Sequence, residues 1–498
     1  MRVSTGSTDE NCGGAGVTGR RIVVVGSGMA TTRLVEGLVA RGVARTDAVT
    51  VLGDEPHAPY NRILLSAVLE GTHRAESLTL RSPQWYADHG VDLRLGARVL
   101  DVDREQREVM LVDGQRIAYD VLVLATGSIP SLPPIRGLVR MDGTLHPAVH
   151  AFRSLEDCLR LHAAVTGLLD GQDAPGSAVV VGGGLLGLQV ARALGVRGLA
   201  VEVVEGGEHL LRSQVGHQAG RIIQRDLERL GTSVYTGARA VRLTPEGSHP
   251  GGRPGLRLDN GYTLETDLVV LTAGGRPATA LAKRAGLGVR RGLLVDDQLR
   301  TSDPAIHAIG DCVEHAGQVT GFVPPAWEQA SALAEHLAGR DVTYPGARTV
   351  ARLRATDLEV AVLGDPGSEE GQVVEVTNPV VGSHRRLVVR DGVIVAATLV
   401  GDLSRIGLIT QHYDRGTVLG PEEPGDLLMA DRPDHAGRPA SLPDDAEVCT
   451  CAGVTAGAVR ACTSLEQVCE TTRATTGCGG CAPVVRQLLA TRTAVPVP

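Results

Sequence analysis

Two segments of this chain have the pattern of a buried β-strand that runs through a glycine turn into an α-helix. Each segment has an apolar run, closely spaced glycines, a helical stretch and then a second apolar run. The first unit spans residues 21–52 and the second spans residues 177–204. A continuous apolar strand that feeds a helix through glycines is typical of a parallel, doubly wound sheet. The chain is therefore predicted to have an α/β fold with two doubly wound dinucleotide-binding domains.

The glycines of the two turns have separate physical tasks. The first permits the tight bend, the second lets a pyrophosphate approach the backbone, and the third lets helix and strand pack closely. The phosphate then lies on N–H groups at the positive end of the helix. Thr31 replaces the third glycine of the first unit and is expected to loosen the packing there. The candidate turn residues are Gly26, Gly28, Met29 and Ala30 in the first unit and Gly182, Gly184 and Gly187 in the second.

Each unit also has acidic residues after its second strand. Asp54 and Glu55 are the candidates in the first unit, with Glu55 preferred, and Glu205 is the candidate in the second. A carboxylate at this place accepts hydrogen bonds from a ribose 2′-hydroxyl and repels a 2′-phosphate, which favours NADH over NADPH. The alternative for each residue is a solvated surface acid.

Length and charge restrict the class of protein further. A chain of 498 residues is long enough for three or four domains. A formal net charge of −8 without a long basic stripe gives no footprint for nucleic acid. No apolar run has the length of a membrane-spanning helix, so no membrane contact is expected. Residues 1–20 lack the apolar core of a signal peptide and are predicted to be a disordered tail, with the cytoplasm as default compartment.

Later parts of the chain have weaker signals. Two further apolar strands are expected, and each ends in a glycine-containing turn: residues 120–124 with Ala125-Thr126-Gly127, and residues 268–272 with Ala273-Gly274-Gly275. Residues 352–364 and 385–400 are β-rich, with a turn at Asp391-Gly392, and predict a small α+β domain. Residues 420–445 are dense in Pro, Gly and Asp and are predicted to be a linker.

The stretch from Arg21 to about Asp402 resembles the flavoprotein reductases with two dinucleotide domains. Ala125-Thr126-Gly127 is similar to their strand-ending motif beside FAD. Gly310-Asp311 is similar to their late motif, in which the Asp hydrogen-bonds the FAD ribityl chain; a helix N-cap is the alternative for Asp311. The segment 325–330, with Trp327, is similar to the helix start that faces the flavin pyrimidine. The resemblance implies FAD in the first unit and NADH in an inserted second unit, with Gly274 among the residues that bind NADH.

The flavin region also resembles one group of these reductases. Residues 59–66 contain no thiol where disulfide reductases and peroxidases of this type have a redox cysteine, so disulfide chemistry is not expected. Glu55-Pro56-His57 and the run from Tyr60 to Ser66 are similar to NADH-dependent nitrite reductase large subunits and to the assimilatory nitrate reductase electron-transfer subunits. In that comparison Arg62 contacts the FAD phosphates; the alternative is a surface salt bridge.

Six of the nine cysteines lie between residues 449 and 481. Clustered thiols in a large chain indicate metal ligands rather than disulfides. The four paired ones, with 26 residues between the pairs, are Cys449, Cys451, Cys478 and Cys481. They can hold a [2Fe–2S] cluster or one Zn²⁺. The spacing resembles the bacterioferritin-associated ferredoxin-like module, which implies the cluster. Cys462 and Cys469 are expected to be packed thiols.

These resemblances imply a division of the chain and a function. The expected parts are a tail at 1–20, an FAD-binding domain at 21–145 and 272–338, an NAD(H)-binding domain at 146–271, an interface domain at 339–419, a linker at 420–445 and a small helical [2Fe–2S] module at 446–492. NADH gives two electrons as hydride, and a cluster accepts one at a time. The chain is therefore expected to pass electrons from NADH through FAD and the cluster to a protein acceptor, with no general acid or base assigned.

The implied acceptor is the catalytic subunit of an assimilatory nitrate (or nitrite) reductase. The chain stops at Pro498 without a further cysteine set, so six-electron reduction by the chain itself is not expected. Two alternatives stay open. One is an NADH-dependent reductase for a ferredoxin, a rubredoxin or another redox partner, and the other is a non-catalytic redox or iron sensor.

Overall fold

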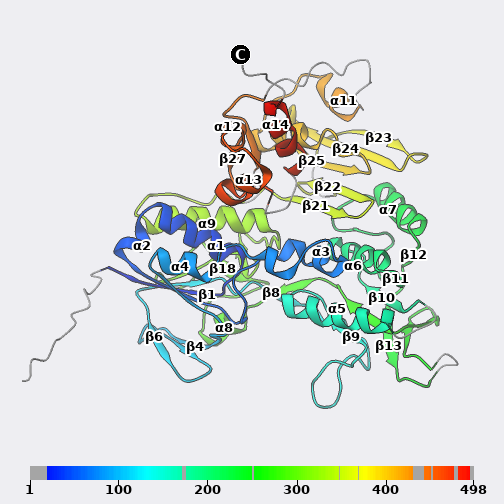
Figure 1. Cartoon of the computed structure of the whole chain (residues 1–498), viewed down its shortest axis with the longest axis horizontal. Coiled ribbons are helices and arrows are strands. Elements are labelled where there is room, and N and C mark those ends of the chain that lie inside the picture. The colour runs from blue at the N-terminus through cyan, green and yellow to red at the C-terminus, as the bar shows by residue number, and fades with distance from the viewer. Residues whose placement is uncertain are drawn as a thin grey trace, which may run out of the picture.

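The structure is a computed structural model that describes residues 19–170, 175–248, 252–346, 348–367, 370–429, 442–449, 452–475 and 481–493. Figure 1 shows two α/β units below, an antiparallel sheet at the upper right and a small helical unit at the top. We call these the first domain, the inserted domain, the antiparallel domain and the cysteine module. In the part of the chain that is described, no helix is both long and apolar enough to cross a membrane.

The first domain is built on a five-stranded parallel sheet in the order β19-β7-β1-β2-β3. The strands are β1 (Arg21–Val25), β2 (Ala48–Leu52), β3 (Val91–Arg94), β7 (Val121–Leu124) and β19 (Ile306–Ala308). Helices α1 (Met29–Ala40), α2 (Val43–Thr46), α4 (Pro83–Asp88) and α9 (Val323–Leu337) pack on one face. Gly37 lets α1 and α9 approach closely, because a Cβ there would lie 2.6 Å from Cβ of Ala334.

The other face of this sheet is covered by shorter elements. They are the antiparallel strands β4 (Val99–Asp103), β5 (Glu108–Leu111) and β6 (Arg116–Ala118), the parallel pair β18 (Leu293–Val295) and β20 (Val313–His315), and α8 (Ala280–Arg284). The connection after β2 holds η1 (Arg62–Leu64), α3 (Leu65–Glu70) and η2 (Ala75–Leu78). The tail predicted at 1–20 lies outside the described residues up to residue 18, but its last residue is held in place. Arg20 forms an ion pair with Asp47 at 2.6 Å.

The inserted domain repeats the parallel arrangement in the order β12-β11-β10-β16-β9. Its strands are β9 (Val149–Ala151), β10 (Ser177–Val181), β11 (Ala200–Glu205), β12 (Thr232–Thr236) and β16 (Leu268–Leu271). Helices α5 (Leu155–Asp170), α6 (Leu185–Val196) and α7 (His217–Arg229) lie on one face. Strands β13 (Ala240–Thr244), β14 (Gly255–Leu258) and β15 (Thr263–Glu265) cover the other. The chain enters and leaves this domain through β8 (Ser128–Pro130) and β17 (Gly275–Pro277), which pair antiparallel to each other.

The antiparallel domain has the sheet order β21-β22-β25-β24-β23. Its strands are β21 (Val350–Ala355), β22 (Leu358–Leu363), β23 (Gln372–Asn378), β24 (Ser383–Arg390) and β25 (Val393–Val400), and α10 (Ile406–Arg415) packs on the sheet. The turn expected at Asp391-Gly392 joins β24 to β25 with φ of 52° and 77°, as a two-residue hairpin requires.

One prediction is wrong in part here. The segment predicted as a linker begins with α11 (Glu423–Leu428), which is not a connection but a packed element. Leu427 and Leu428 are buried in the core of the antiparallel domain. The two leucines are the only strong apolar pair in a stretch otherwise rich in Pro, Gly and Asp, so composition concealed the helix. Residues 430–441 of the predicted linker lie outside the described residues.

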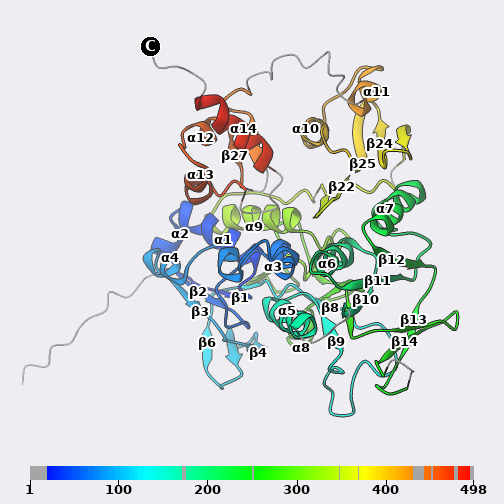
Figure 2. The same ribbon diagram turned by 45° about the vertical axis from the view of Figure 1, so that its right-hand side comes forward.

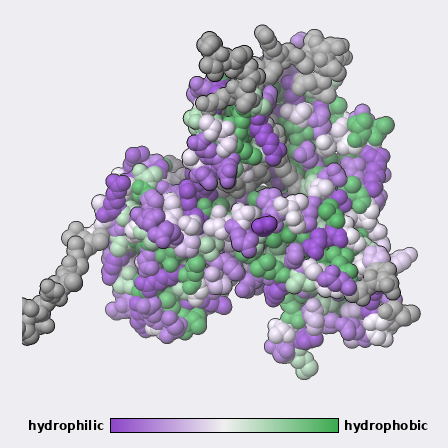
Figure 3. Space-filling view, viewed as in Figure 1, coloured by the Kyte–Doolittle hydropathy of each residue, from purple (hydrophilic) through white to green (hydrophobic). Residues whose placement is uncertain are grey.

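The cysteine module contains β26 (Glu447–Cys449), β27 (Val454–Thr455), α12 (Ala456–Arg460), α13 (Leu465–Thr472) and α14 (Ala482–Thr493). Its small core is formed by residues such as Val459, Val468 and Val485, all fully buried. Figures 1 and 2 agree that α13 lies beside α1 and α9 of the first domain. Figure 3 shows hydrophilic residues interspersed with hydrophobic ones over the visible surface of the domains.

Candidate dinucleotide and cluster sites

The first glycine turn is shaped for a close approach of backbone to a ligand. Gly26 has a φ of 109°, and a Cβ there would lie 2.2 Å from the carbonyl oxygen of Ala125. Gly28 is the N-cap of α1, no side chain caps the helix, and a Cβ there would meet nothing within 4 Å. The first turn of α1, which begins with Met29 and Ala30, therefore has no side-chain cap, and there is open space beside Gly28 at the positive end of the helix. Such an end binds phosphate well.

Thr31 behaves differently from the sequence-based expectation of loosened packing. Its side chain is fully buried, and its hydroxyl donates a hydrogen bond to the carbonyl oxygen of Gly26 at 2.7 Å. Threonine satisfies its polar atom inside the turn, so the helix and the strand stay tied together without a third glycine.

The second turn has a glycine, Gly187, at the position that Thr31 occupies in the first turn. Gly182 has a φ of 118°, and a Cβ on Gly187 would lie 1.9 Å from the Gly182 carbonyl oxygen. Gly184 is the N-cap of α6 and, like Gly28, has open space around it and no side-chain cap on the helix. Gly274 follows β16 with a φ of 91° and also borders open space. The inserted domain thus offers a second cradle of the same kind.

The acidic residue of the second unit lies against its glycine turn. Glu205 Oε2 accepts from the Gly183 N–H and Oε1 accepts from the Gly207 N–H, each at 2.7 Å. Strand register identifies the equivalent place in the first unit. Val181 pairs with Val204, and Val25 pairs with Leu52, so Gly53 occupies the position that corresponds to Glu205. Ser27 fills the space there, because a Cβ on Gly53 would lie 2.5 Å from the serine hydroxyl.

The two acids proposed for the first unit lie further along the loop. Asp54 is exposed and faces Arg98 at 3.9 Å. Glu55 forms an ion pair with Arg62 and accepts a hydrogen bond from the Tyr60 hydroxyl at 2.7 Å. Burial raises the pKa of Tyr60, which keeps the hydroxyl protonated and donating. The structure therefore brings together Glu55 and Arg62, which both came from the same sequence motif.

Asp311 belongs to a second cluster of polar side chains, which lies where the first domain meets the inserted domain. Its Oδ2 accepts from the Ser128 hydroxyl and from the Arg153 guanidinium, both at 2.8 Å. Arg62 donates to the backbone carbonyl of Arg153 at 3.4 Å. A continuous set of contacts thus runs from Glu55 to Asp311 where the first and inserted domains meet.

The remaining residues predicted for the first cradle also converge. Ala125 directly follows β7, and its N–H donates to the Val25 carbonyl. The Thr126 hydroxyl donates to the Ala278 carbonyl at 2.8 Å. Gly127 follows with a φ of 67°. Gly310 lies against Ala30, and its N–H donates to Gln329 at 2.7 Å. Trp327 Nε1 donates to the Met29 carbonyl at 3.2 Å and so joins the start of α9 to the start of α1.

Sequence reasoning missed Arg153 and Ser128. The sequence next to Arg153 does contain a helix-start signal, because Ser154 and Asp157 form a capping box at the beginning of α5. The box fixes where the helix begins, and Arg153 therefore sits at its entrance. Its partner Asp311 is 158 residues away, which no local pattern reveals.

The two described cysteines of the α/β domains are poor redox groups. Cys158 and Cys312 are fully buried, and neither is in a disulfide. Burial raises the pKa of the Cys158 thiol to about 12 and also raises the pKa of Cys312. A thiol reacts as its thiolate, so neither residue suits disulfide exchange.

The cysteine module brings two of the four predicted ligands into one core. Cys449 and Cys481 are both buried, and the Thr475 N–H donates to the Cys481 sulfur at 3.1 Å. Backbone hydrogen bonds to sulfur are typical of iron–sulfur ligands. Cys451 and Cys478 lie outside the described residues. Cys462 and Cys469 bond instead to the hydroxyls of Thr471 and Thr475.

Comparison with known proteins identifies the class. Residues 20–332 match the model of the pyridine nucleotide-disulphide oxidoreductase family, and residues 447–491 match the BFD-like [2Fe-2S] binding domain. The chain belongs to the pyridine nucleotide-disulphide oxidoreductase family and carries a BFD-like [2Fe–2S] binding domain. It is an FAD-dependent NAD(P)H oxidoreductase, and the α/β fold class and the cofactors predicted from the sequence are confirmed.

Two proteins of known function are similar to this chain over most of its length. The chain is 34% identical over 491 residues to a nitrite reductase [NAD(P)H] of Bacillus subtilis (strain 168), which covers 94% of this chain and 57% of that protein. It is 32% identical over 486 residues to the assimilatory nitrate reductase electron transfer subunit of the same organism, covering 94% of this chain and 59% of that protein. The chain thus spans a little over half the length of these relatives.

Among solved structures, the fold is similar to the covalent putidaredoxin reductase–putidaredoxin complex. The TM-score is 0.72 at 26% identity, over 83% of this chain and 97% of that chain. The fold and the two cradles therefore fit FAD and a nicotinamide dinucleotide. When bound, the flavin supplies the hydride-accepting chemistry, and the residues described above contribute binding and orientation.

Proposed function

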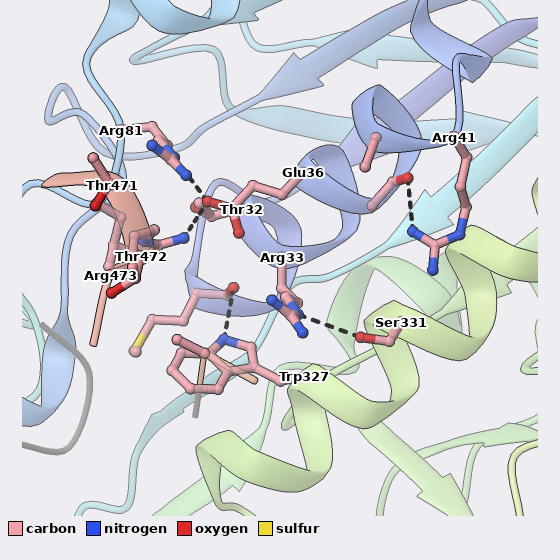
Figure 4. Close-up of a pocket in the computed structure, with 15 residues that line it drawn as sticks. Thr32, Arg33, Glu36, Arg41, Arg81, Trp327, Ser331, Thr471, Thr472 and Arg473 are labelled. Carbon is pink, nitrogen blue, oxygen red and sulfur yellow. Dashed lines mark hydrogen bonds and ion pairs between the residues drawn. The ribbon is translucent and has the colours of Figure 1, made fainter. Parts of the chain in front are cut away.

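We propose that this chain oxidises NADH and passes the electrons singly, through its [2Fe–2S] cluster, to a separate reductase protein. The observation that carries the proposal is the position of the cysteine module. Its residues Ala452 and Arg473 line the same cavity as Met29 and Trp327 of the first domain (Figure 4). A one-electron carrier placed beside the start of α1 is suited to accept electrons from a flavin bound there.

The proposed binding residues follow from the two cradles. FAD is held in the first domain and NADH in the inserted domain, with the nicotinamide and the flavin meeting at the junction marked by Asp311 and Arg153. The FAD set is Gly26, Gly28, Met29, Ala30, Glu55, Arg62, Ala125, Thr126, Gly127, Gly310, Asp311 and Trp327. The NADH set is Gly182, Gly184, Gly187, Glu205 and Gly274, and the cluster ligands are Cys449, Cys451, Cys478 and Cys481. We also propose the domain limits predicted from the sequence, with one change: the antiparallel domain extends through α11.

The proposed acceptor is the catalytic subunit of an assimilatory nitrate reductase. The name of one relative, an assimilatory nitrate reductase electron transfer subunit, supports this choice. The test is to mix the purified chain, NADH, nitrate and that catalytic subunit, and to measure nitrite. Nitrite should form in the mixture and in neither protein alone. A silent mixture with an active catalytic subunit would exclude this acceptor.

A second candidate is a reductase for a ferredoxin. It is favoured by the similarity to a structure in which a reductase is joined to putidaredoxin. Rapid NADH-dependent reduction of a purified ferredoxin, with no nitrite from the nitrate reductase mixture, would select this candidate. Slow NADH oxidation with every acceptor, including small dyes, would instead indicate a sensor.

A further inference from the structure

An ion pair joins the residue after α13 to the middle of α1. Arg473, which follows α13, pairs with Glu36 of α1, 437 residues away (Figure 4). The side chains are only 19% and 14% exposed. Burial lowers the pKa of Arg473, as expected for a cation withdrawn from water. We call Glu36 and Arg473 the docking pair.

Glu36 is held in place by a second cation. Arg81 donates to the same carboxylate oxygen at 2.8 Å, and its guanidinium lies over the Trp85 ring at 5.0 Å from the centroid. Two arginines therefore share one carboxylate, one from the first domain and one from the cysteine module. Loss of the carboxylate would leave two shielded cations facing each other, which is far less favourable than the intact group.

The backbone conformation of Arg473 indicates that this position needs the arginine side chain. Its φ of 61° lies in the left-handed region that glycine adopts without strain. Arginine at this place costs conformational energy that a glycine would not. The guanidinium in return reaches across to Glu36.

The docking pair is close to Cys481, one of the proposed cluster ligands. Two residues after Arg473, the Thr475 N–H bonds to the Cys481 sulfur. Ala452, directly after the first cysteine pair, lines the same cavity of about 300 Å³ as Arg473. Trp327 and Met29 of the first domain also line this cavity. The docked arrangement thus places Ala452 and Arg473 of the cysteine module in one cavity with the start of α1.

We propose that the docking pair fixes the cysteine module on α1 and α9 in the arrangement in which its cluster is reduced from within the same chain. Glu36 and Arg473 are positioning residues for this internal step. The inference rests on the proposed function, and it adds the surface on which the module accepts electrons. Oxidation of one NADH to NAD⁺ and H⁺ releases two electrons, and a [2Fe–2S] cluster holds one, so the cluster must be filled and emptied twice for each NADH.

The test measures the internal step in the full-length holoprotein without any partner protein. NADH is mixed rapidly with the enzyme, and flavin bleaching and cluster reduction are followed at separate wavelengths. Glu36→Gln should slow cluster reduction about tenfold, in line with the loss of a shielded charge partner, and leave flavin bleaching at the wild-type rate. Arg473→Gly should do the same, and it keeps the left-handed backbone free of strain.

A matched control is available on the neighbouring helix. Glu335 of α9 pairs with Arg41 and Arg340, both outside the cysteine module. Glu335→Gln should therefore leave both rates unchanged. The cluster reduction potential should be the same in Glu36→Gln and wild type, because the pair acts by position. Amide hydrogen exchange in α1 and α13 should rise in Glu36→Gln.

The proposal would be overturned by wild-type cluster reduction in both Glu36→Gln and Arg473→Gly. It would also fail if flavin bleaching slowed equally, or if a changed potential accounted for the slower step. Since no partner is present, these results are distinct from a failure of the proposed function, which would appear as a wild-type cluster that NADH does not reduce or as a silent partner assay.

Discussion

The Glu205 carboxylate is fixed against the backbone of Gly183, whose N–H donates to Oε2 at 2.7 Å. A fixed negative charge at the end of β11 favours a ribose hydroxyl over a phosphate. Glu205→Gln should reduce the ratio of kcat/KM for NADH to that for NADPH by roughly tenfold, which is about 1.4 kcal/mol. Glu202→Gln is the control, since Glu202 lies on the same strand but bonds to the Tyr235 hydroxyl. An unchanged ratio in the Glu205 variant would make Glu205 a surface acid.

A second prediction separates the flavin from the cluster. Cys449→Ser removes a proposed ligand in the cysteine module and should abolish electron transfer to a protein acceptor. NADH-driven reduction of a small dye should persist, because the two dinucleotide cradles lie in other domains. Cys469→Ser should leave both activities intact, since the Cys469 thiol bonds to Thr475. Equal loss of both activities in a Cys449 variant that retains FAD would contradict the separation.

A third prediction compares two glycines of α6. Gly187→Ala would place a Cβ 1.9 Å from the Gly182 carbonyl oxygen, whereas a Cβ on Gly195 meets only the Arg192 guanidinium at 3.5 Å. Gly187→Ala should destabilise the protein by about 1–3 kcal/mol and weaken NADH binding. Gly195→Ala should stabilise it by about 0.5–1 kcal/mol. Thermal unfolding and NADH titration measure both, and equal behaviour of the variants would refute the assigned role of Gly187.

A fourth prediction concerns acid stability. His307 in β19 is 4% exposed, and burial lowers its pKa from 6.5 to about 4. The unfolded chain therefore binds a proton between these values that the native chain does not, so stability falls as the pH drops from 6.5 through 4. The loss reaches about 3 kcal/mol for a shift of this size.

His307→Gln should remove this component and flatten the pH dependence of the unfolding free energy between pH 6.5 and 4. His73 is exposed, so His73→Gln serves as the control and should retain the wild-type slope. A wild-type slope in the His307 variant would show that other groups cause the acid sensitivity.

Local patterns predicted the parts of this protein that depend on local chemistry. Glycines at 26 and 182 must bend the chain after a buried strand, and the Asp391-Gly392 dipeptide adopts the backbone angles of a hairpin turn, so both were readable from the sequence. Thr31 was misjudged because its hydroxyl satisfies the Gly26 carbonyl, a contact that a glycine-based motif does not include. The two leucines of α11 were hidden by their composition.

Contacts between distant segments could not be predicted in the same way. Arg153 meets Asp311, and Arg473 meets Glu36, across separations of 158 and 437 residues. Each contact depends on how completed domains pack, which is fixed by many buried side chains together. The position equivalent to Glu205 also required strand register, since it is a glycine in the first unit.

The antiparallel pairing of β8 with β17 has a mechanical consequence. Both connections to the inserted domain run side by side, and Gly275, Arg276 and Pro277 pair with Pro130, Ile129 and Ser128. A two-stranded ribbon resists stretching along its strands and sliding of one strand past the other, because either would break several hydrogen bonds at once, but it bends out of its own plane at little cost. The ribbon therefore fixes the sideways register of the inserted domain against the first domain, and any movement between the two domains has to bend the ribbon rather than stretch it.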